Sequence, residues 1–418
     1  MTYSMIEHAA ELATPLGKKA KQGSGMKDLL VIPDGSVIWK DDTILFVGTT
    51  KKAHAWIEQS LPAGRAIKRI DASGKTVIPG YVDPHTHFVF GGYRDNEFNM
   101  RLQGASYMEI MEAGGGIAAT NRATREASED ELYASGWQRL ERMLDLGITT
   151  VEGKTGYGED TETEDKMLRV MERLDRDHPV DLVKTYMGAH AIPPRFKGKP
   201  ADYIDYLIEE GLPMAEGRAE FCDIFTEKNV FELDDSERLL LAALDRGFKL
   251  KMHADEIVPL GGAGLAAKLK VTSADHLLKA SDQDLLAMRD AGVIATLLPL
   301  TAFSLKEPYA RGRFMIDQGL AVALGTDLNP GSCYSQSISL MIALATIYIS
   351  LTVEETLTAV TLNAAASIGL AESRGSLEAG KKADILLLDC PNHGHLSYHF
   401  GMNLVETVIK NGEVVRPA

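Results

Sequence analysis

Cysteine is scarce in this sequence. The three cysteines among 418 residues, Cys222, Cys333 and Cys390, are far apart and form no CxxC pair. This spacing excludes a thiolate metal cluster and a dense disulfide framework, and it favours a reducing cytoplasm as the location of the protein. We expect no export signal, because the first residues lack a basic start and place Glu7 and Glu11 where an apolar run would have to be.

Positive charge is also in short supply. The chain has 44 Lys and Arg residues against 59 Asp and Glu residues, a formal net charge of −15. Binding to a phosphate backbone depends on cations that displace counterions. We therefore expect a small-molecule substrate as the partner and no nucleic acid.

Long hydrophobic runs are almost missing. One uncharged stretch, "SISLMIALATIYISL" (337–351), is interrupted by serine and threonine and is shorter than the roughly 20 apolar residues that a membrane span needs. It is hydrophobic nearly all round, which is typical of a buried helix. We expect no membrane partner.

What the chain does have is an alternation of short β-rich runs with longer segments of helical pattern. This alternation predicts parallel strands joined by helical crossovers, and eight such units predict an α/β fold with a closed (β/α)8 barrel of the TIM type. Plausible helices cover 164–177, 201–212 and 235–247. The predicted strands are 77–84, 148–153, 182–189, 221–226, 250–254, 272–277, 293–299 and 321–327.

The two ends of the chain have a different pattern. Short strands separated by turns are predicted at 26–48, 383–390 and 406–415. The pair Asn411-Gly412 in the last of these regions is a strong hairpin signal. We predict that both ends form one small discontinuous β domain. The expected divisions are residues 1–76 for its N-terminal part, 77–370 for the barrel and 371–418 for its C-terminal part.

Titratable residues follow nearly every predicted barrel strand. In such a barrel the carboxyl ends of the strands form one rim, and that rim holds the active site. We therefore expect these side chains to gather in one place. They are His85, His87, Glu152, Lys154, His190, Glu227, His253, Glu256, His276 and Asp327.

The rim residues indicate a metal site. Alternate side chains of a strand point the same way, so His85 and His87 can face one ion, although such a pair can also be purely structural. Imidazoles and a carboxylate suit Zn²⁺ or Fe²⁺, with one position open for the water that hydrolysis needs. Five residues compete for four ligand places: His85, His87, His253, His276 and Asp327.

Glu256 follows His253 by three residues and is a natural carboxylate for proton transfer if it is not a ligand. The alternative is a salt bridge on the rim with Lys251 or Arg94.

Eight segments together resemble one known family. They are "PHTHFVFGGYRDNEF" (84–98), "RLQGASYMEIMEAGGGI" (101–117), "EGKTGYG" (152–158), "GAHAIP" (188–193), "HADE" (253–256), "SADHL" (273–277), "LLPLTAFSL" (297–305) and "TDLNPGS" (326–332). The chain resembles the amidohydrolase superfamily of metal-dependent hydrolases, and within it the imidazolonepropionase family. Members of that family open the cyclic amide of 4-imidazolone-5-propanoate to N-formimidoyl-L-glutamate in histidine degradation.

The resemblance implies roles for individual residues. One divalent ion, zinc or iron, would be bound by His85, His87, His253 and Asp327. Catalysis would involve Glu256, His276 and Asp327. The resemblance further implies a homodimer and these substrate contacts: Arg94, Tyr107, Tyr157, His190, Glu256, Asn329, Gly331 and Ser332.

The chemistry of the substrate agrees with two of these roles. Its propanoate tail needs a cation, and Arg94 has a guanidinium fork for a carboxylate, although it could instead pair with Asp95 or Glu97 on the surface. Tyr157 lies in a glycine-flanked loop, where an aromatic side chain is often exposed and suits a wall against a flat ring.

The sequence departs from the family pattern at two places. Cys333 and Tyr334 follow Ser332, where the family usually has Ser-Pro, and Asp95 stands where a small residue is common. We expect these changes to alter how the last loop packs beside the substrate.

Other functions remain open at this point. The same barrel suits another cyclic amidohydrolase or an aminohydrolase, such as a hydantoinase, a dihydroorotase or a cytosine deaminase-like enzyme. A dinuclear relative would need a carboxylated lysine, for which Lys154 is the candidate. A metal-free binding protein on this barrel is expected to have lost ligands, whereas here all are present.

Overall fold

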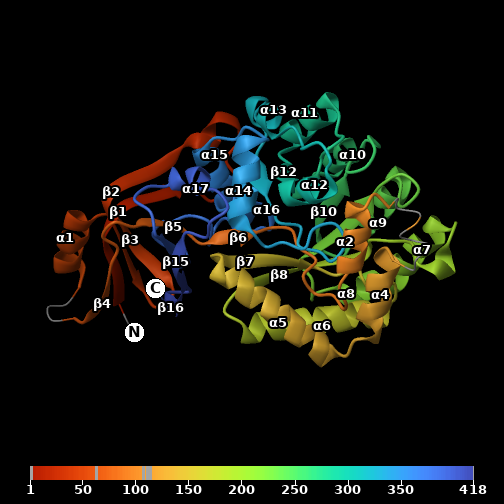
Figure 1. Cartoon of the computed structure of the whole chain (residues 1–418), viewed down its shortest axis with the longest axis horizontal. Helices are drawn as coiled ribbons and strands as arrows, with labels where there is room; N and C mark the ends of the chain where they lie inside the picture. Colours follow the sequence, from red (N-terminus) through yellow and green to blue (C-terminus); the bar gives the residue numbers. More distant parts are fainter. Residues whose placement is uncertain (1–2, 62–64, 106–108, 110–114, 418) are drawn as a thin grey trace.

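The computed structural model describes residues 3–61, 65–105, 109 and 115–417. Two sheets of eight strands each organise this part of the chain, a barrel and a terminal sheet that both ends of the chain share (Figure 1). Each sheet has its own hydrophobic core, and Trp39, Leu387 and Ile409 belong to that of the terminal sheet.

The barrel consists of eight parallel strands in chain order. Their residues are buried almost throughout, as expected of parallel strands covered by helices on the outside. The strands are β6 (Tyr81–Asp83), β7 (Ile148–Lys154), β8 (Asp181–Ala189), β9 (Phe221–Thr226), β10 (Lys249–Ala254), β11 (Ser273–His276), β12 (Ile294–Leu297) and β13 (Val322–Leu324).

The ring closes just beyond β6 and β13. Asp327 N donates to His85 O at 3.0 Å and His87 N donates to Leu328 O at 2.9 Å, around a parallel bridge between Thr86 and Leu328. The segments that close the barrel therefore carry three of the predicted metal ligands, His85, His87 and Asp327. The predicted (β/α)8 barrel is confirmed.

The first predicted strand, 77–84, is wrong as a single element. It is divided into β5 (Thr76–Pro79), which belongs to the terminal sheet, and β6 in the barrel. Gly80 lies between them, and a Cβ there would approach the Thr149 hydroxyl to 2.3 Å. The chain thus passes from one sheet to the other at a position where only glycine fits.

Helices cover the outside of the barrel (Figure 1). Among the described helices none is long and apolar enough to cross a membrane. The described α-helices are α1 (Thr50–Ser60), α2 (Asp95–Leu102), α4 (Ile117–Glu126), α5 (Glu129–Asp145), α6 (Thr161–Asp177), α7 (Pro200–Tyr206), α8 (Leu212–Ala215), α9 (Leu233–Asp245), α10 (Gly262–Leu269), α11 (Asp282–Ala291), α12 (Pro299–Leu305), α13 (Gly312–Asp317), α14 (Ile338–Ile347), α15 (Val353–Ala359), α16 (Leu362–Ser367) and α17 (His395–Tyr398).

Three of the four predicted helices appear as continuous elements. The predictions at 164–177 and 235–247 correspond to α6 and α9, and the apolar run at 337–351 contains the largely buried α14. The helix predicted at 201–212 is not continuous, because α7 ends at Tyr206 and a wider π turn occupies Leu207–Gly211.

The terminal sheet has the order β16-β15-β14-β5-β1-β2-β3, with β4 paired to β1. Asn411 and Gly412 both have positive φ between β15 and β16, so the predicted hairpin is confirmed. The long N-terminal strand β1 lies in the centre of the sheet and was not predicted. The strands are β1 (Tyr3–Pro15), β2 (Leu29–Lys40), β3 (Thr43–Thr49), β4 (Ile67–Asp71), β14 (Ile385–Leu388), β15 (Val405–Lys410) and β16 (Glu413–Arg416).

Candidate active site

Four histidines and one aspartate meet at the rim of the barrel. His85 and His87 follow β6, His253 lies in β10, His276 ends β11 and Asp327 follows β13. All are at most 3% exposed. Candidate ligand atoms of His85, His87 and His253 lie within 4.8 Å of one another, as do those of His85, His276 and Asp327.

The geometry fits a metal ion. His85 Nε2 is buried and lacks a hydrogen-bond partner among the described residues. Asp327 Oδ1 lies 3.6 Å from His85 Nε2 and 3.8 Å from His87 Nε2. Ligands that surround one ion at about 2.1 Å are separated by about 3 to 4 Å, so these atoms are spaced as a coordination shell requires.

The electrostatics leave most of the imidazoles neutral. Burial lowers the pKa of His85, His87 and His276 well below the usual value. Burial acts the same way on His253, but the charge of Asp223 outweighs it and the net pKa is raised. Neutral imidazoles keep a lone pair for a metal, which a protonated ring lacks.

Two carboxylates support the histidines from below the rim. His85 Nδ1 donates to Asp275 Oδ2 at 2.6 Å, and His253 Nδ1 lies 3.1 Å from Asp223 Oδ2. Such partners orient the ring so that Nε2 faces the metal. The sequence prediction missed both aspartates. The signal was a charged residue inside a run of buried strand residues, where an unpaired charge is costly.

Lys154 lies in the same layer. Its ammonium donates to Glu152 at 2.9 Å and to Asp223 at 2.7 Å, and burial is outweighed by these charges, which raise its pKa. A carboxylated lysine requires the neutral amine and would add negative charge beside two carboxylates. The environment of Lys154 therefore disfavours the dinuclear alternative.

Glu256 and His276 face each other at the edge of this cluster, with 3.5 Å between Glu256 Oε2 and His276 Nε2. Burial raises the pKa of Glu256 to about 8, and repulsion from Asp327 adds to it. The alternative of a salt bridge with Lys251 or Arg94 is wrong, because Lys251 pairs with Glu152 at 2.8 Å and Arg94 pairs elsewhere.

The backbone at the rim is strained where it carries these side chains. His276 has a φ of 73° and Asp327 a φ of 51°, values that non-glycine residues seldom adopt. Beside them, Asp255 has a φ of 50°. Its carboxylate accepts from four backbone amides, those of Leu260, Gly261, Gly262 and Ala263. This loop anchor holds the turn in which Glu256 lies, and the sequence did not reveal it.

A cavity of about 570 Å³ opens over the cluster. Tyr157 is 3% exposed, so it is a buried wall and not an exposed loop residue as expected. The ring of His190 stacks on that of His87, with centroids 4.8 Å apart, and its Nδ1 lies 3.2 Å from Gly156 O. The predicted site residues in its lining are His87, Arg94, Tyr157, His190, His253, Glu256, His276, Asp327, Asn329, Gly331 and Ser332.

Arg94 lines the cavity and pairs with Glu97 in its wall, where both side chains are largely buried, and its contact with the substrate stays a prediction. Its Nε and Nη2 donate to Glu97 Oε2 at 2.9 and 2.7 Å. Glu97 Oε1 in turn accepts from Gly116 N at 3.1 Å. Tyr107, the other predicted contact, lies outside the described residues.

The loop 329–332 forms one side of the cavity. Asn329 Oδ1 accepts from the amides of Gly331 and Ser332, each at 2.8 Å. Arg101, which the prediction omitted, donates to Gly331 O at 2.9 Å. Cys333 is buried, with its Sγ 3.3 Å from Thr326 O, so this departure from the family pattern is accommodated inside the loop.

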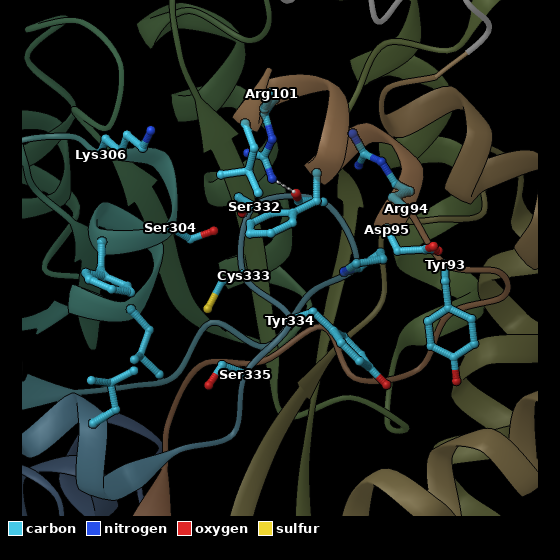
Figure 2. A pocket seen from close by; sticks show the side chains of 17 residues that line it. Tyr93, Arg94, Asp95, Arg101, Ser304, Lys306, Ser332, Cys333, Tyr334 and Ser335 are labelled. Atoms are coloured by element: carbon cyan, nitrogen blue, oxygen red, sulfur yellow. Dashed lines mark hydrogen bonds between the residues drawn. The ribbon is translucent and has the colours of Figure 1, made fainter. Parts of the chain in front are cut away.

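A second, more apolar pocket of about 790 Å³ adjoins the first behind this loop (Figure 2). Arg94, Arg101, Gly331 and Ser332 line both. Figure 2 shows Arg101 reaching the loop beside Ser332, with Tyr93 and Tyr334 lower in the view.

Known proteins share this sequence and fold. The model of the Amidohydrolase family matches residues 102–416. An imidazolonepropionase of Parabacteroides distasonis is 55% identical over 412 residues, which are 98% of each chain. One of Clostridium tetani is 52% identical over 98% of this chain and 97% of the relative. The chain belongs to the imidazolonepropionase family of amidohydrolases.

Solved structures show the amidohydrolase fold at low sequence identity. An atrazine chlorohydrolase from Arthrobacter aurescens complexed with zinc has a TM-score of 0.74 at 16% identity, over 99% of this chain and 95% of that one. An adenosine deaminase from Xanthomonas campestris with bound zinc has a TM-score of 0.69 at 17% identity, over 99% and 93%. This chain thus shares its fold with both of these proteins.

Proposed function

We propose that the chain hydrolyses the ring amide of 4-imidazolone-5-propanoate to N-formimidoyl-L-glutamate, at the cavity above the histidine cluster. The observation that carries this proposal is the 55% identity to an imidazolonepropionase over 98% of both chains. The buried histidines and carboxylates in the cavity support it independently, because hydrolysis of a cyclic amide needs an activated water and a proton donor.

One divalent ion, zinc or iron, would be held by His85, His87, His253 and Asp327. The distances from Asp327 to His85 and His87 support this set. When bound, such an ion lowers the pKa of a coordinated water and polarises a carbonyl. His276 is assigned to the reaction instead, because its Nε2 faces Glu256.

Arg94 would bind the propanoate tail. Its Nη1 points to Gly331, since a Cβ on that glycine would meet Nη1 at 2.3 Å, and its other edge is held by Glu97. The ring of the substrate would then have Tyr157 and His190 on one side and the histidine cluster on the other. Asn329 and Ser332 would face it from the loop 329–332. These contacts orient the ring carbonyl toward the cluster.

Glu256 would move the proton. Its raised pKa of about 8 suits a group that accepts a proton from water and delivers it to the departing ring nitrogen. His276 would hydrogen-bond the carbonyl oxygen as negative charge develops there, and Asp327 would share in removing the proton from water.

The test compares four rings in one assay. Purified protein, supplied with zinc or with iron, is added to 4-imidazolone-5-propanoate, hydantoin, dihydroorotate and cytosine. We expect only the first to be consumed, with N-formimidoyl-L-glutamate as product and one metal equivalent per chain. Hydrolysis of another ring with none of the first would overturn the proposal, and two metal equivalents would overturn the mononuclear site.

A further inference from the structure

Five charged side chains are fully buried beneath the histidine cluster. Two lysines, Lys154 and Lys251, alternate with three carboxylates, Glu152, Asp223 and Asp275, and every one of these side chains has an exposure of 0%. They come from β7, β9, β10 and β11. Removing charges from water costs free energy that their mutual attraction only partly offsets, so buried ion pairs add little to stability. Stability alone therefore does not explain this cluster.

Lys154 lies between the two aspartates that touch the histidines. Its Nζ is 2.7 Å from Asp223 Oδ2 and 3.7 Å from Asp275 Oδ2. Those same two oxygens face His253 Nδ1 at 3.1 Å and His85 Nδ1 at 2.6 Å. Through these two carboxylates, the ammonium of Lys154 is therefore linked to two imidazoles from different parts of the barrel rim, those of His253 and His85.

We propose that Lys154 is a positioning residue of the metal centre: it holds Asp223 and Asp275 so that His253 and His85 both present Nε2 to the same point. This inference rests on the proposed metal site. Without Lys154 the two carboxylates lose a shared cation and repel each other at low dielectric, and each would draw its histidine out of place.

Lys251 reinforces the layer from the other side. Its Nζ donates to Glu152 at 2.8 Å and to the carbonyl oxygen of Pro84 at 2.9 Å, and it lies 3.5 Å from Asp275. The backbone just before His85 is thereby attached to the charged layer. Asp223 lies outside the contacts of Lys251 given by the structure, so Lys154 is the residue that connects both histidine partners.

The experiment measures zinc affinity of the substrate-free protein by competition with a chromophoric chelator, with circular dichroism to confirm that each variant is folded. We expect Lys154→Met and Asp223→Asn each to weaken zinc binding by about 10- to 100-fold, the usual effect of losing an outer partner of a ligand. The double variant should lose far less than the product of the two, because Lys154 acts through Asp223.

The control is a buried lysine elsewhere. Lys381 is 2% exposed and its Nζ donates to Gly17 O at 2.6 Å and Ala371 O at 2.7 Å. Lys381→Met should lower the melting temperature yet leave zinc affinity unchanged. If Lys154 had a purely structural role, Lys154→Met would likewise lower the melting temperature and leave zinc affinity unchanged.

Zinc affinity of folded Lys154→Met within about threefold of wild type would overturn the inference, since outer partners matter more than that. If Lys154→Met does not fold, Lys154→Gln is measured in its place, because glutamine is also uncharged but keeps a polar end for Asp223. A 10- to 100-fold weaker zinc affinity in folded Lys154→Gln would support the inference, and an affinity within about threefold of wild type would overturn it. Wild-type protein that binds neither zinc nor iron would refute the proposed metal site itself, whereas zinc binding without ring hydrolysis would refute only the proposed substrate.

Discussion

Arg94 and Glu97 form an ion pair in the wall of the catalytic cavity, with Nε and Nη2 of the arginine on a single oxygen of the glutamate at 2.9 and 2.7 Å. Both are largely buried, at 17% and 13% side-chain exposure. Glu97 thus orients the guanidinium and leaves Nη1 directed at Gly331. A carboxylate that enters the cavity meets a cation whose direction is already set.

Arg94→Lys should raise KM for 4-imidazolone-5-propanoate by about 10- to 100-fold, because lysine cannot make the paired hydrogen bonds to a carboxylate that contribute about 1.5 to 3 kcal/mol. The change in kcat should be smaller. Steady-state kinetics provide the measurement, and Arg238→Lys, on the exposed surface beside Asp205, is the control. An unchanged KM would mean that another residue binds the tail.

Gly331→Ala should also raise KM, by about tenfold, through displacement of Arg94. The added Cβ would lie 2.3 Å from Nη1 and 3.0 Å from Cζ of Arg94, and the guanidinium must move away. The melting temperature should hardly change, since a flexible side chain absorbs the contact. Gly25→Ala, where the nearest atom is 3.9 Å away, serves as the control. Equal KM in both variants would contradict the proposed place of the tail.

Glu256→Gln should lower kcat by about 100- to 10,000-fold, the range over which a positioned proton carrier contributes. Metal content should match that of wild type, because Glu256 is placed outside the ligand set. Glu216→Gln is the matched control, an exposed carboxylate that pairs with Arg246 at 3.1 Å. A kcat close to the wild-type value would remove Glu256 from the reaction.

His393 should make stability depend on pH. Its Nδ1 lies 2.6 Å from Glu11 in β1, and this hydrogen bond raises the pKa of His393 above its usual 6.5. A raised folded-state pKa means that the contribution is complete below about pH 6.5 and is lost as pH rises through the folded value. Burial raises the pKa of Glu11, but the hydrogen bonds and charge of His393 outweigh it, and the net pKa of Glu11 lies below its usual 4.5. At the acid end the pair is therefore lost as pH falls through this lowered pKa.

The measurement is the difference in melting temperature between wild type and His393→Gln. It should be larger at about pH 6 than at about pH 9, where wild type has lost the charged pair. The contribution should be about 1 kcal/mol or less, as for other partly exposed pairs. A difference that is constant across this range would show that the pair carries no charge.

Much of the fold follows from local pattern. Alternating strand and helix segments predict the barrel, and Asn411-Gly412 predicts a hairpin, because side-chain periodicity and turn chemistry act over a few residues. The division of 77–84 at Gly80 and the central place of β1 did not follow. The division depends on Thr149 and Asp384, which contact Gly80 from more than sixty residues away. The central place of β1 depends on its pairing with β2, β4 and β5.

The site divides in the same way. The amino-acid sequence alone predicts that six side chains meet at one rim, because each follows or ends a predicted strand. They are His85, His87, His253, His276, Glu256 and Asp327. Only the folded barrel brings Asp223, Asp275 and Lys154 beneath them, and only it joins Arg94 to Glu97 at the cavity wall. The physical reason is that a buried charge is stable only next to its partners, and those partners lie on other strands whose register the linear chain does not contain.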